Sequence, residues 1–210
     1  GYETFVKCKG VLDTVVCLVS CTDSHSKANV NRSMEDALQN TCDLIRTAKQ
    51  DGVRVQAYAS LAFGCPFEGD VDPKVVENIF QHYVEAGADV MVLADTLGVG
   101  TPVQVKELVK VASDTVKDLS KIGMHVHDAH GKASENIQAA AKLGVRRFDS
   151  AVGGCGGCNF VPDADGNIAT ETVLRVLDHM NISHGMDRKA IEKANRHLQQ
   201  CLGRKLIQFG

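Results

Sequence analysis

Hydrophobic and polar positions follow two alternating patterns along the chain, one typical of buried strands and the other of amphipathic helices. Residues 14–20 (TVVCLVS) form an apolar, β-branched run, which predicts a buried strand. Four more strands are expected at 53–61, 89–94, 122–126 and 145–150. Segments with helical spacing separate these runs, so the chain alternates strongly between the two kinds of element.

The predicted helices have recognisable ends. Asp72-Pro73 and Thr101-Pro102 are expected to begin two of them, because a capping side chain before proline suits the first helical turn. Ser33 is expected to begin another, with Asp36 three residues later. The predicted helices span 33–51, 72–86, 101–119, 133–143, 169–180 and 187–202. Strict alternation of this kind predicts a parallel sheet with right-handed crossovers.

Two architectures fit this alternation, an open doubly wound sheet and part of a (β/α)8 barrel. Polar residues collect directly after the predicted strands, at Asp95, at His125 to Asp128 and in the loop 153–167. A barrel places its catalytic residues around a ring at this end of the strands, whereas an open sheet collects ligands near one switch point. We therefore predict an α/β fold of the (β/α)8 TIM-barrel type, forming one domain over residues 1–210.

Composition narrows the class of protein. The 210 residues are 44% hydrophobic and 23% charged, with a formal charge of −3, which is typical of a globular protein with a substantial core. Basic runs and apolar stretches of about 20 residues are both missing from the sequence, so we expect neither a nucleic-acid partner nor a membrane span. Eight cysteines lie partly in apolar segments, and no secretory leader is visible, which predicts a reduced, intracellular protein.

The strongest local signal for chemistry is His125-Val-His127-Asp128. Residues i and i+2 of a strand point to the same face, so the two imidazoles are able to meet one metal ion. The alternative is a pair of histidines on a half-buried strand. Asp128 either orients a ligand or caps the following turn.

Three further positions carry candidate groups. Cys155 and Cys158 lie in a glycine-rich loop. In one interpretation one of the two thiols has no function, and in the other a mobile loop brings one cysteine over a bound substrate. Asn167 precedes a predicted helix and serves either as its cap or as a metal ligand through its amide oxygen. Asp95 follows an apolar strand and is a candidate general base or substrate-orienting group. Cys201 is either a peripheral regulatory thiol or a buried helix residue, and we expect the second.

Taken together, these segments resemble the hydroxymethylglutaryl-CoA (HMG-CoA) lyase family of metal-dependent TIM-barrel lyases. The motifs that carry the resemblance are 63–69 (FGCPFEG), 94–102 (ADTLGVGTP), 125–128 (HVHD), 156–158 (GGC) and 166–171 (GNIATE). The combination is far more specific than any single motif, because HxHD alone also fits isopropylmalate and homocitrate synthases.

The resemblance implies a cleavage of HMG-CoA into acetyl-CoA and acetoacetate, as in leucine degradation and ketone body metabolism. His125, His127 and the Asn167 oxygen would bind Mg²⁺ or Mn²⁺. Cys158 would be the catalytic acid, on a substrate loop that includes Gly156 and Gly157. His125 or Asp95 would act as the base. The remaining catalytic candidate is Glu171, near the site.

The chain also departs from the family pattern. No Arg-Asp pair, which the family carries on its first strand, is found in the sequence, so only strands four to eight of the barrel are expected to be present. The segment 158–165 (CNFVPDAD) differs from the usual loop, which leaves the preferred acyl group open. A Claisen-type acyl-CoA synthase and a non-catalytic truncated barrel remain alternatives. In full length we expect a homodimer, located in the cytoplasm or alternatively in the mitochondrial matrix.

Overall fold

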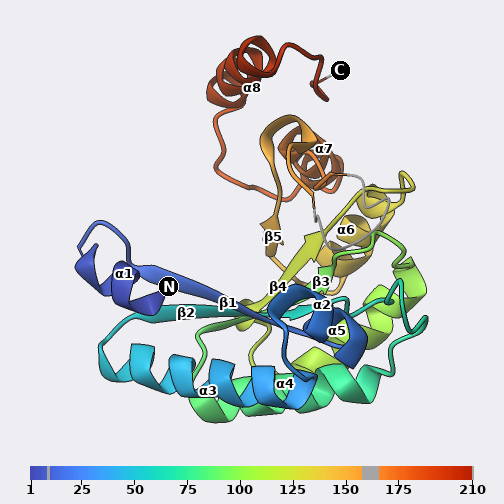
Figure 1. The fold of residues 1–210 in the computed structure, drawn as a ribbon. Coiled ribbons are helices and arrows are strands. Elements are labelled where there is room, and N and C mark those ends of the chain that lie inside the picture. Colours follow the sequence, from blue (N-terminus) through green and yellow to red (C-terminus); the bar gives the residue numbers. More distant parts are fainter. Residues whose placement is uncertain (9, 158–165, 210) are drawn as a thin grey trace.

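The fold is built on one sheet of five parallel strands. The computed structural model describes residues 1–8, 10–157 and 166–209. The strands lie in sequential order, each hydrogen-bonded to the next (Figure 1). They are β1 (Thr14–Ser20), β2 (Arg54–Ser60), β3 (Val90–Asp95), β4 (Ile122–Val126) and β5 (Arg147–Asp149).

Helices connect the strands and follow the last one. The α-helices are α1 (Tyr2–Lys7), α2 (Asp23–Val30), α3 (Met34–Gln50), α4 (Pro73–Ala86), α5 (Pro102–Val116), α6 (Ala133–Lys142), α7 (Thr170–His179) and α8 (Arg188–Leu202). Two short 3-10 helices, η1 (Leu119–Lys121) and η2 (Val152–Gly154), lie next to β4 and β5. From α3 to α7, each large helix packs against the next one along the chain. This arrangement of parallel strands inside a row of helices is that of a (β/α)8 barrel over five of its units.

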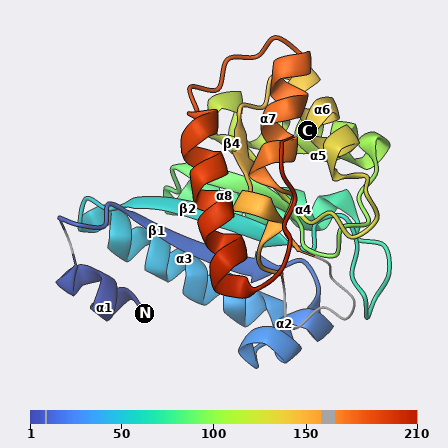
Figure 2. The same cartoon turned by 90° about the horizontal axis from the view of Figure 1, so that it is seen from above.

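The two faces of the sheet have different surroundings. Alternate residues of β1 are buried under the helices, whereas Val16 and Leu18 on the opposite face are 61% and 45% exposed. Figure 1 shows α3 and α4 side by side below the sheet, and the main core lies between these layers. The opposite face corresponds to the interior of a barrel, and α8 lies on that side beyond α7, as the view from above also shows (Figure 2).

The five predicted strands and the six predicted helices are all found, and the helix starts agree best. Ser33 caps α3 by accepting a hydrogen bond from the Asp36 backbone N–H at 3.1 Å. Thr101 begins α5 with a complete capping box. The predicted end of α5 at residue 119 is wrong, because Lys117 adopts a left-handed conformation with φ of 60° after Val116.

Two short helices were not predicted from the sequence. Helix α2 has the sequence DSHSKANV, which contains no apolar stripe of helical spacing. Helix α1 precedes the first strand. Among the described residues, no helix combines the length and the apolar character needed to cross a membrane.

Candidate active site

A cavity of about 460 Å³ opens at the carboxyl ends of the strands, on the face that corresponds to the barrel interior. His125 and His127 line it together with Asn167, so the structure brings the three predicted metal ligands to one place. Gly157, predicted to belong to the substrate loop, lines the same cavity. Its remaining walls come mainly from β1, β2, β3, α2 and the residues after β5.

The two histidines are held by the end of β4. Their ring centroids lie 5.3 Å apart, and the His127 side chain is almost completely buried. The His127 backbone N–H donates to the Asp95 carbonyl oxygen at 3.1 Å, which extends the pairing of β3 with β4 by one residue. His127 also forms an antiparallel bridge with Asn167. Main-chain pairing therefore fixes the relative positions of both expected ligands.

Asn167 is oriented by the glycine-rich loop. Its amide Nδ2 donates to the Cys155 carbonyl oxygen at 2.9 Å, and its Oδ1 has no hydrogen bond to any described residue. A Cβ at Gly156 would lie 2.7 Å from Asn167 Nδ2, and the φ of Gly156 is +96°, so only glycine suits this position. Asn167 does not cap α7, whose N-cap is Ala169.

This donor set fits a hard divalent cation. Two imidazoles and one amide oxygen leave room for water and substrate oxygens, as octahedral Mg²⁺ and Mn²⁺ require. Among the described residues, no group of three or more His, Cys, Asp or Glu side chains is arranged to hold a metal ion. The cavity therefore offers a partial ligand set with one oxygen donor, and not a closed zinc-type site.

Two residues that the sequence analysis did not single out complete this wall of the cavity. Tyr58 donates from its hydroxyl to Asp149 Oδ2 at 2.5 Å, and the same carboxylate oxygen lies 3.4 Å from His125 Nδ1. Burial and the adjacent Asp149 carboxylate raise the pKa of Tyr58, so its hydroxyl remains a proton donor. Asp149 pairs directly with His125 in the register of β4 and β5, and it orients that imidazole.

Asp95 is the last residue of β3, and its predicted role as a base or substrate-orienting group stays a prediction. Its side chain is buried, and its two carboxylate oxygens accept hydrogen bonds from the backbone N–H groups of Gly98, Val99 and Gly100, at 3.0, 3.1 and 2.9 Å. Burial raises the pKa of Asp95 to about 6, against the opposing effect of these three donors. The neighbours Ala94 and Thr96 line the cavity, whereas the Asp95 carboxylate holds the following loop.

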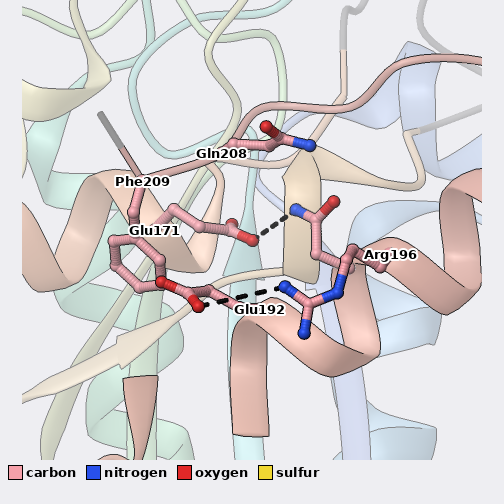
Figure 3. A pocket seen from close by; sticks show the side chains of 6 residues that line it. Glu171, Glu192, Arg196, Gln208 and Phe209 are labelled. Atoms are coloured by element: carbon pink, nitrogen blue, oxygen red, sulfur yellow. Dashed lines mark hydrogen bonds and ion pairs between the residues drawn. The ribbon is translucent and has the colours of Figure 1, made fainter. Parts of the chain in front are cut away.

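Glu171 lies in another cavity, of about 230 Å³, between α7, α8 and the end of the chain (Figure 3). Its carboxylate accepts hydrogen bonds from the Gly153 backbone N–H at 2.8 Å and from Asn195 Nδ2 at 2.5 Å. Asn195 also donates to the Ile207 carbonyl oxygen at 2.6 Å. Through these contacts Glu171, on α7, positions the start of the glycine-rich loop at Gly153. Its predicted catalytic role stays a prediction.

Three other sequence predictions have separate outcomes. Asp128 Oδ1 accepts from the Ala133 N–H at 3.1 Å, so it caps the turn into α6. The prediction that Cys201 is buried is wrong, because this residue is exposed on α8. Cys158, the predicted catalytic acid, lies outside the described residues.

Parallel strands in sequential order, with candidate ligands at their carboxyl ends, are typical of barrel enzymes. The family model described as HMGL-like matches residues 6–198, and the chain belongs to this family, as the motifs predict. A relative from Pseudomonas aeruginosa, named 3-hydroxy-3-isohexenylglutaryl-CoA/hydroxy-methylglutaryl-CoA lyase, is 35% identical over 97% of this chain and 67% of its own length.

Solved structures agree with this membership and confirm the predicted fold class. The crystal structure of hydroxymethylglutaryl-CoA lyase from Pseudomonas aeruginosa matches with a TM-score of 0.90 and 32% identity, over 98% of this chain and 68% of that one. A lyase structure from Acinetobacter baumannii, in complex with coenzyme A and 3-methylmalate, matches with a TM-score of 0.90, 29% identity and coverage of 98% and 67%.

Other relatives show how names vary within the family. A Chloroflexus aurantiacus relative named (R)-citramalyl-CoA lyase is 34% identical over 98% of this chain. Relatives from zebrafish and human carry names that place them in the cytoplasm and in mitochondria, respectively. The chain spans 55–67% of the length of these curated relatives. The names are those of carbon–carbon lyases, the predicted class of enzyme.

Proposed function

We propose that the protein containing this chain is a divalent-metal-dependent lyase that cleaves HMG-CoA, or a close analogue, into acetyl-CoA and an oxo acid. With HMG-CoA the second product is acetoacetate. The observation that carries the proposal is the convergence of His125, His127 and Asn167 on one cavity in a chain of the HMGL-like family. Relatives named for HMG-CoA, isohexenylglutaryl-CoA and citramalyl-CoA leave the preferred acyl group as a matter for experiment.

The metal would be held by the two imidazoles and the Asn167 amide oxygen. A bound Mg²⁺ or Mn²⁺ supplies Lewis acidity, which lowers the pKa of a substrate hydroxyl and fixes its position. The hydrogen bond from Asn167 Nδ2 to Cys155 supports this assignment, because it leaves the amide oxygen directed away from the loop backbone.

Proton transfer in this proposal uses the chain's own side chains. The hydroxyl proton of the substrate leaves as the carbon–carbon bond breaks, and the electron pair of that bond forms the enolate of acetyl-CoA. Asp95 is disfavoured as the proton acceptor, because both its oxygens are already occupied by backbone N–H groups. A neutral imidazole that holds a metal through one nitrogen carries its proton on the other, so His125 would accept the substrate proton only on release from the metal, with His127, Asn167 and substrate oxygens left to hold the ion. Cys158 would protonate the enolate carbon, since a thiol of ordinary pKa, about 8.5, is a suitable acid near neutral pH.

The test measures acetyl-CoA release from HMG-CoA by the complete protein with Mg²⁺ and a thiol reductant. We expect release that stops with EDTA and returns with excess Mg²⁺. Cys158→Ala is expected to reduce kcat by about 10²- to 10⁴-fold with unchanged Mn²⁺ affinity. Absence of release from a folded, metal-loaded sample contradicts the proposal, and condensation of acetyl-CoA with a 2-oxo acid would identify a synthase instead.

The same proposal includes the acyl-CoA partner, a homodimeric full-length form and an intracellular location. The complex of the Acinetobacter relative with coenzyme A supports the acyl-CoA partner. The single domain, the dimer and the choice between cytoplasm and mitochondrial matrix stay predictions.

A further inference from the structure

His25 is a third histidine of the same cavity, and no motif of the sequence points to it. It lies on α2, its side chain is 1% exposed, and it lines the cavity that His125 and His127 line. Asn29, one turn later on the same helix, lines that cavity as well. Helix α2 therefore forms a polar wall that contributes none of the expected metal ligands.

One nitrogen of the His25 ring is satisfied and the other is not. Nδ1 lies 2.8 Å from Ser20 Oγ, whereas Nε2 is buried without a hydrogen-bond partner among the described residues. We assign the tautomer in which the Ser20 hydroxyl donates to Nδ1, because this hydroxyl makes no other hydrogen bond to a described residue and its proton would otherwise have no acceptor. The neutral ring then carries its own proton on Nε2, and burial favours this neutral form by lowering the pKa of His25.

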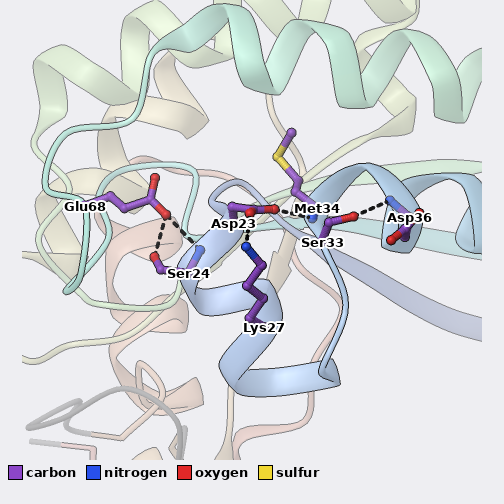
Figure 4. A network of polar contacts seen from close by, with 7 residues as sticks. All are labelled: Asp23, Ser24, Lys27, Ser33, Met34, Asp36 and Glu68. Carbon is purple, nitrogen blue, oxygen red and sulfur yellow. Dashed lines mark hydrogen bonds and ion pairs between the residues drawn. The ribbon is translucent and has the colours of Figure 1, made fainter.

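The helix that carries His25 is fixed on two sides. Glu68 accepts hydrogen bonds from the backbone N–H and the hydroxyl of Ser24, at 2.8 and 2.5 Å (Figure 4). Asp23 accepts from the Met34 backbone N–H at 2.8 Å, at the start of α3. The ring of Phe67 stacks on that of His25 with a centroid separation of 6.4 Å. These contacts keep the imidazole from turning toward a partner elsewhere.

A buried N–H without a partner costs about 1–3 kcal/mol, and His25 lines a ligand-sized cavity, so a ligand bound there would supply the missing partner. We propose that His25 Nε2 donates a hydrogen bond to an oxygen atom of the substrate's acyl group and is a specificity-determining residue. This inference rests on the proposed function, because the acyl group enters only with that class of substrate. The acceptor is either the free carboxylate or the thioester carbonyl oxygen.

Two substitutions at His25 separate a hydrogen bond from simple packing. His25→Phe keeps the ring and its stacking on Phe67 but removes the N–H, whereas His25→Gln keeps a donor at a similar reach and removes the ring. We expect kcat/KM of the complete enzyme for HMG-CoA to fall about 10- to 100-fold in His25→Phe and to stay within about 5-fold in His25→Gln. The opposite order would show a packing role and overturn the inference.

Binding without turnover identifies the acceptor. Calorimetric titration with 3-methylmalate in the presence of Mg²⁺ presents carboxylates without a thioester. Weaker binding of this diacid to His25→Phe identifies a carboxylate acceptor, and unchanged binding with a raised KM for HMG-CoA identifies the thioester carbonyl. His197→Phe, the same change at an exposed position on α8, is the matched control and is expected to resemble the wild type.

The outcomes also distinguish this inference from the proposed function. A wild-type protein that binds 3-methylmalate through His25 but does not cleave HMG-CoA would contradict only the proposed reaction. A protein that cleaves HMG-CoA equally well in the wild type, His25→Phe and His25→Gln would overturn only the role of His25. Thermal unfolding of each variant, with Mn²⁺ affinity as a second check, verifies that the metal-loaded fold is intact.

Discussion

The cavity at the end of β4 and the cluster around Glu171 differ in how completely their polar atoms are hydrogen-bonded. In the cavity, Asn167 Oδ1 and His25 Nε2 make no hydrogen bond to a described residue. In the cluster, both carboxylate oxygens of Glu171 are bonded, and Asn195 joins them to the Ile207 backbone. Both regions carry motifs of the same family, yet the polar atoms named in the first lack a partner among the described residues, whereas the Glu171 carboxylate in the second has a partner for each oxygen.

This difference separates binding from positioning. A buried polar group whose hydrogen bonds are all made within the chain stabilises one arrangement of the backbone. A group held rigidly with one position left open gains its last interaction from a ligand. This criterion supports the proposed placing of His25 and Asn167 at the substrate and metal site, and a positioning role for Glu171 next to the glycine-rich loop.

The largest effect on metal affinity and activity is expected at the proposed metal ligands, which are found in the first region and not in the second. His127→Ala removes one imidazole from a partial ligand set, so Mn²⁺ affinity of the complete protein should fall by at least about 100-fold, with a matching loss of activity. Isothermal titration with Mn²⁺ measures the effect. Glu171→Gln is the control from the second region, and its Mn²⁺ affinity should stay within about 3-fold of the wild type. Unaltered Mn²⁺ affinity in His127→Ala would show that His127 is a buried core histidine and not a metal ligand.

The second prediction concerns the Glu171 cluster. Glu171→Gln replaces one accepting oxygen by an N–H group that faces either Gly153 N–H or Asn195 Nδ2, so a buried donor loses its partner. The free energy of unfolding should fall by about 1–3 kcal/mol in a urea titration. Glu192→Gln, exposed on α8 and 4.0 Å from Arg196, is the matched control and should change stability by less than about 0.5 kcal/mol. Unchanged stability together with lost turnover would make Glu171 catalytic.

The strands, the helix starts and the two histidines that build the site are predicted well from the sequence, because each depends on a pattern of neighbouring residues. Strand β1 is an uninterrupted apolar run, and the two-residue spacing of His125 and His127 places both in one cavity. The helix starts at Ser33 and Thr101 depend only on residues within three positions, and both were predicted correctly. Features encoded by neighbouring residues are therefore accessible without a structure.

The partners of each polar group could not be predicted, because they are distant in sequence. Tyr58 and Asp149 are 91 positions apart, and their hydrogen bond depends on the register of the whole sheet. His25 lies on α2, which lacks the apolar periodicity that identifies a helix. The one available signal for Asp149 was a polar residue at the end of a predicted strand, the same signal that identified Asp95.

The last and smallest effect is expected at Asp95. Its carboxylate is fully hydrogen-bonded, like that of Glu171, but its neighbours Ala94 and Thr96 line the cavity of the first region. In Asp95→Asn, the amide nitrogen faces either Gly100 N–H or the pair formed by Gly98 and Val99 N–H, so at least one hydrogen bond is lost. Burial raises the pKa of the Asp95 carboxyl, so its ionised form is already disfavoured and the neutral amide offsets part of the loss. We expect the free energy of unfolding to fall by about 1 kcal/mol and kcat to fall less than 10-fold, measured by urea titration and acetyl-CoA release. A loss of kcat of about 10³-fold at unchanged stability would instead identify Asp95 as the general base and remove His125 from that role.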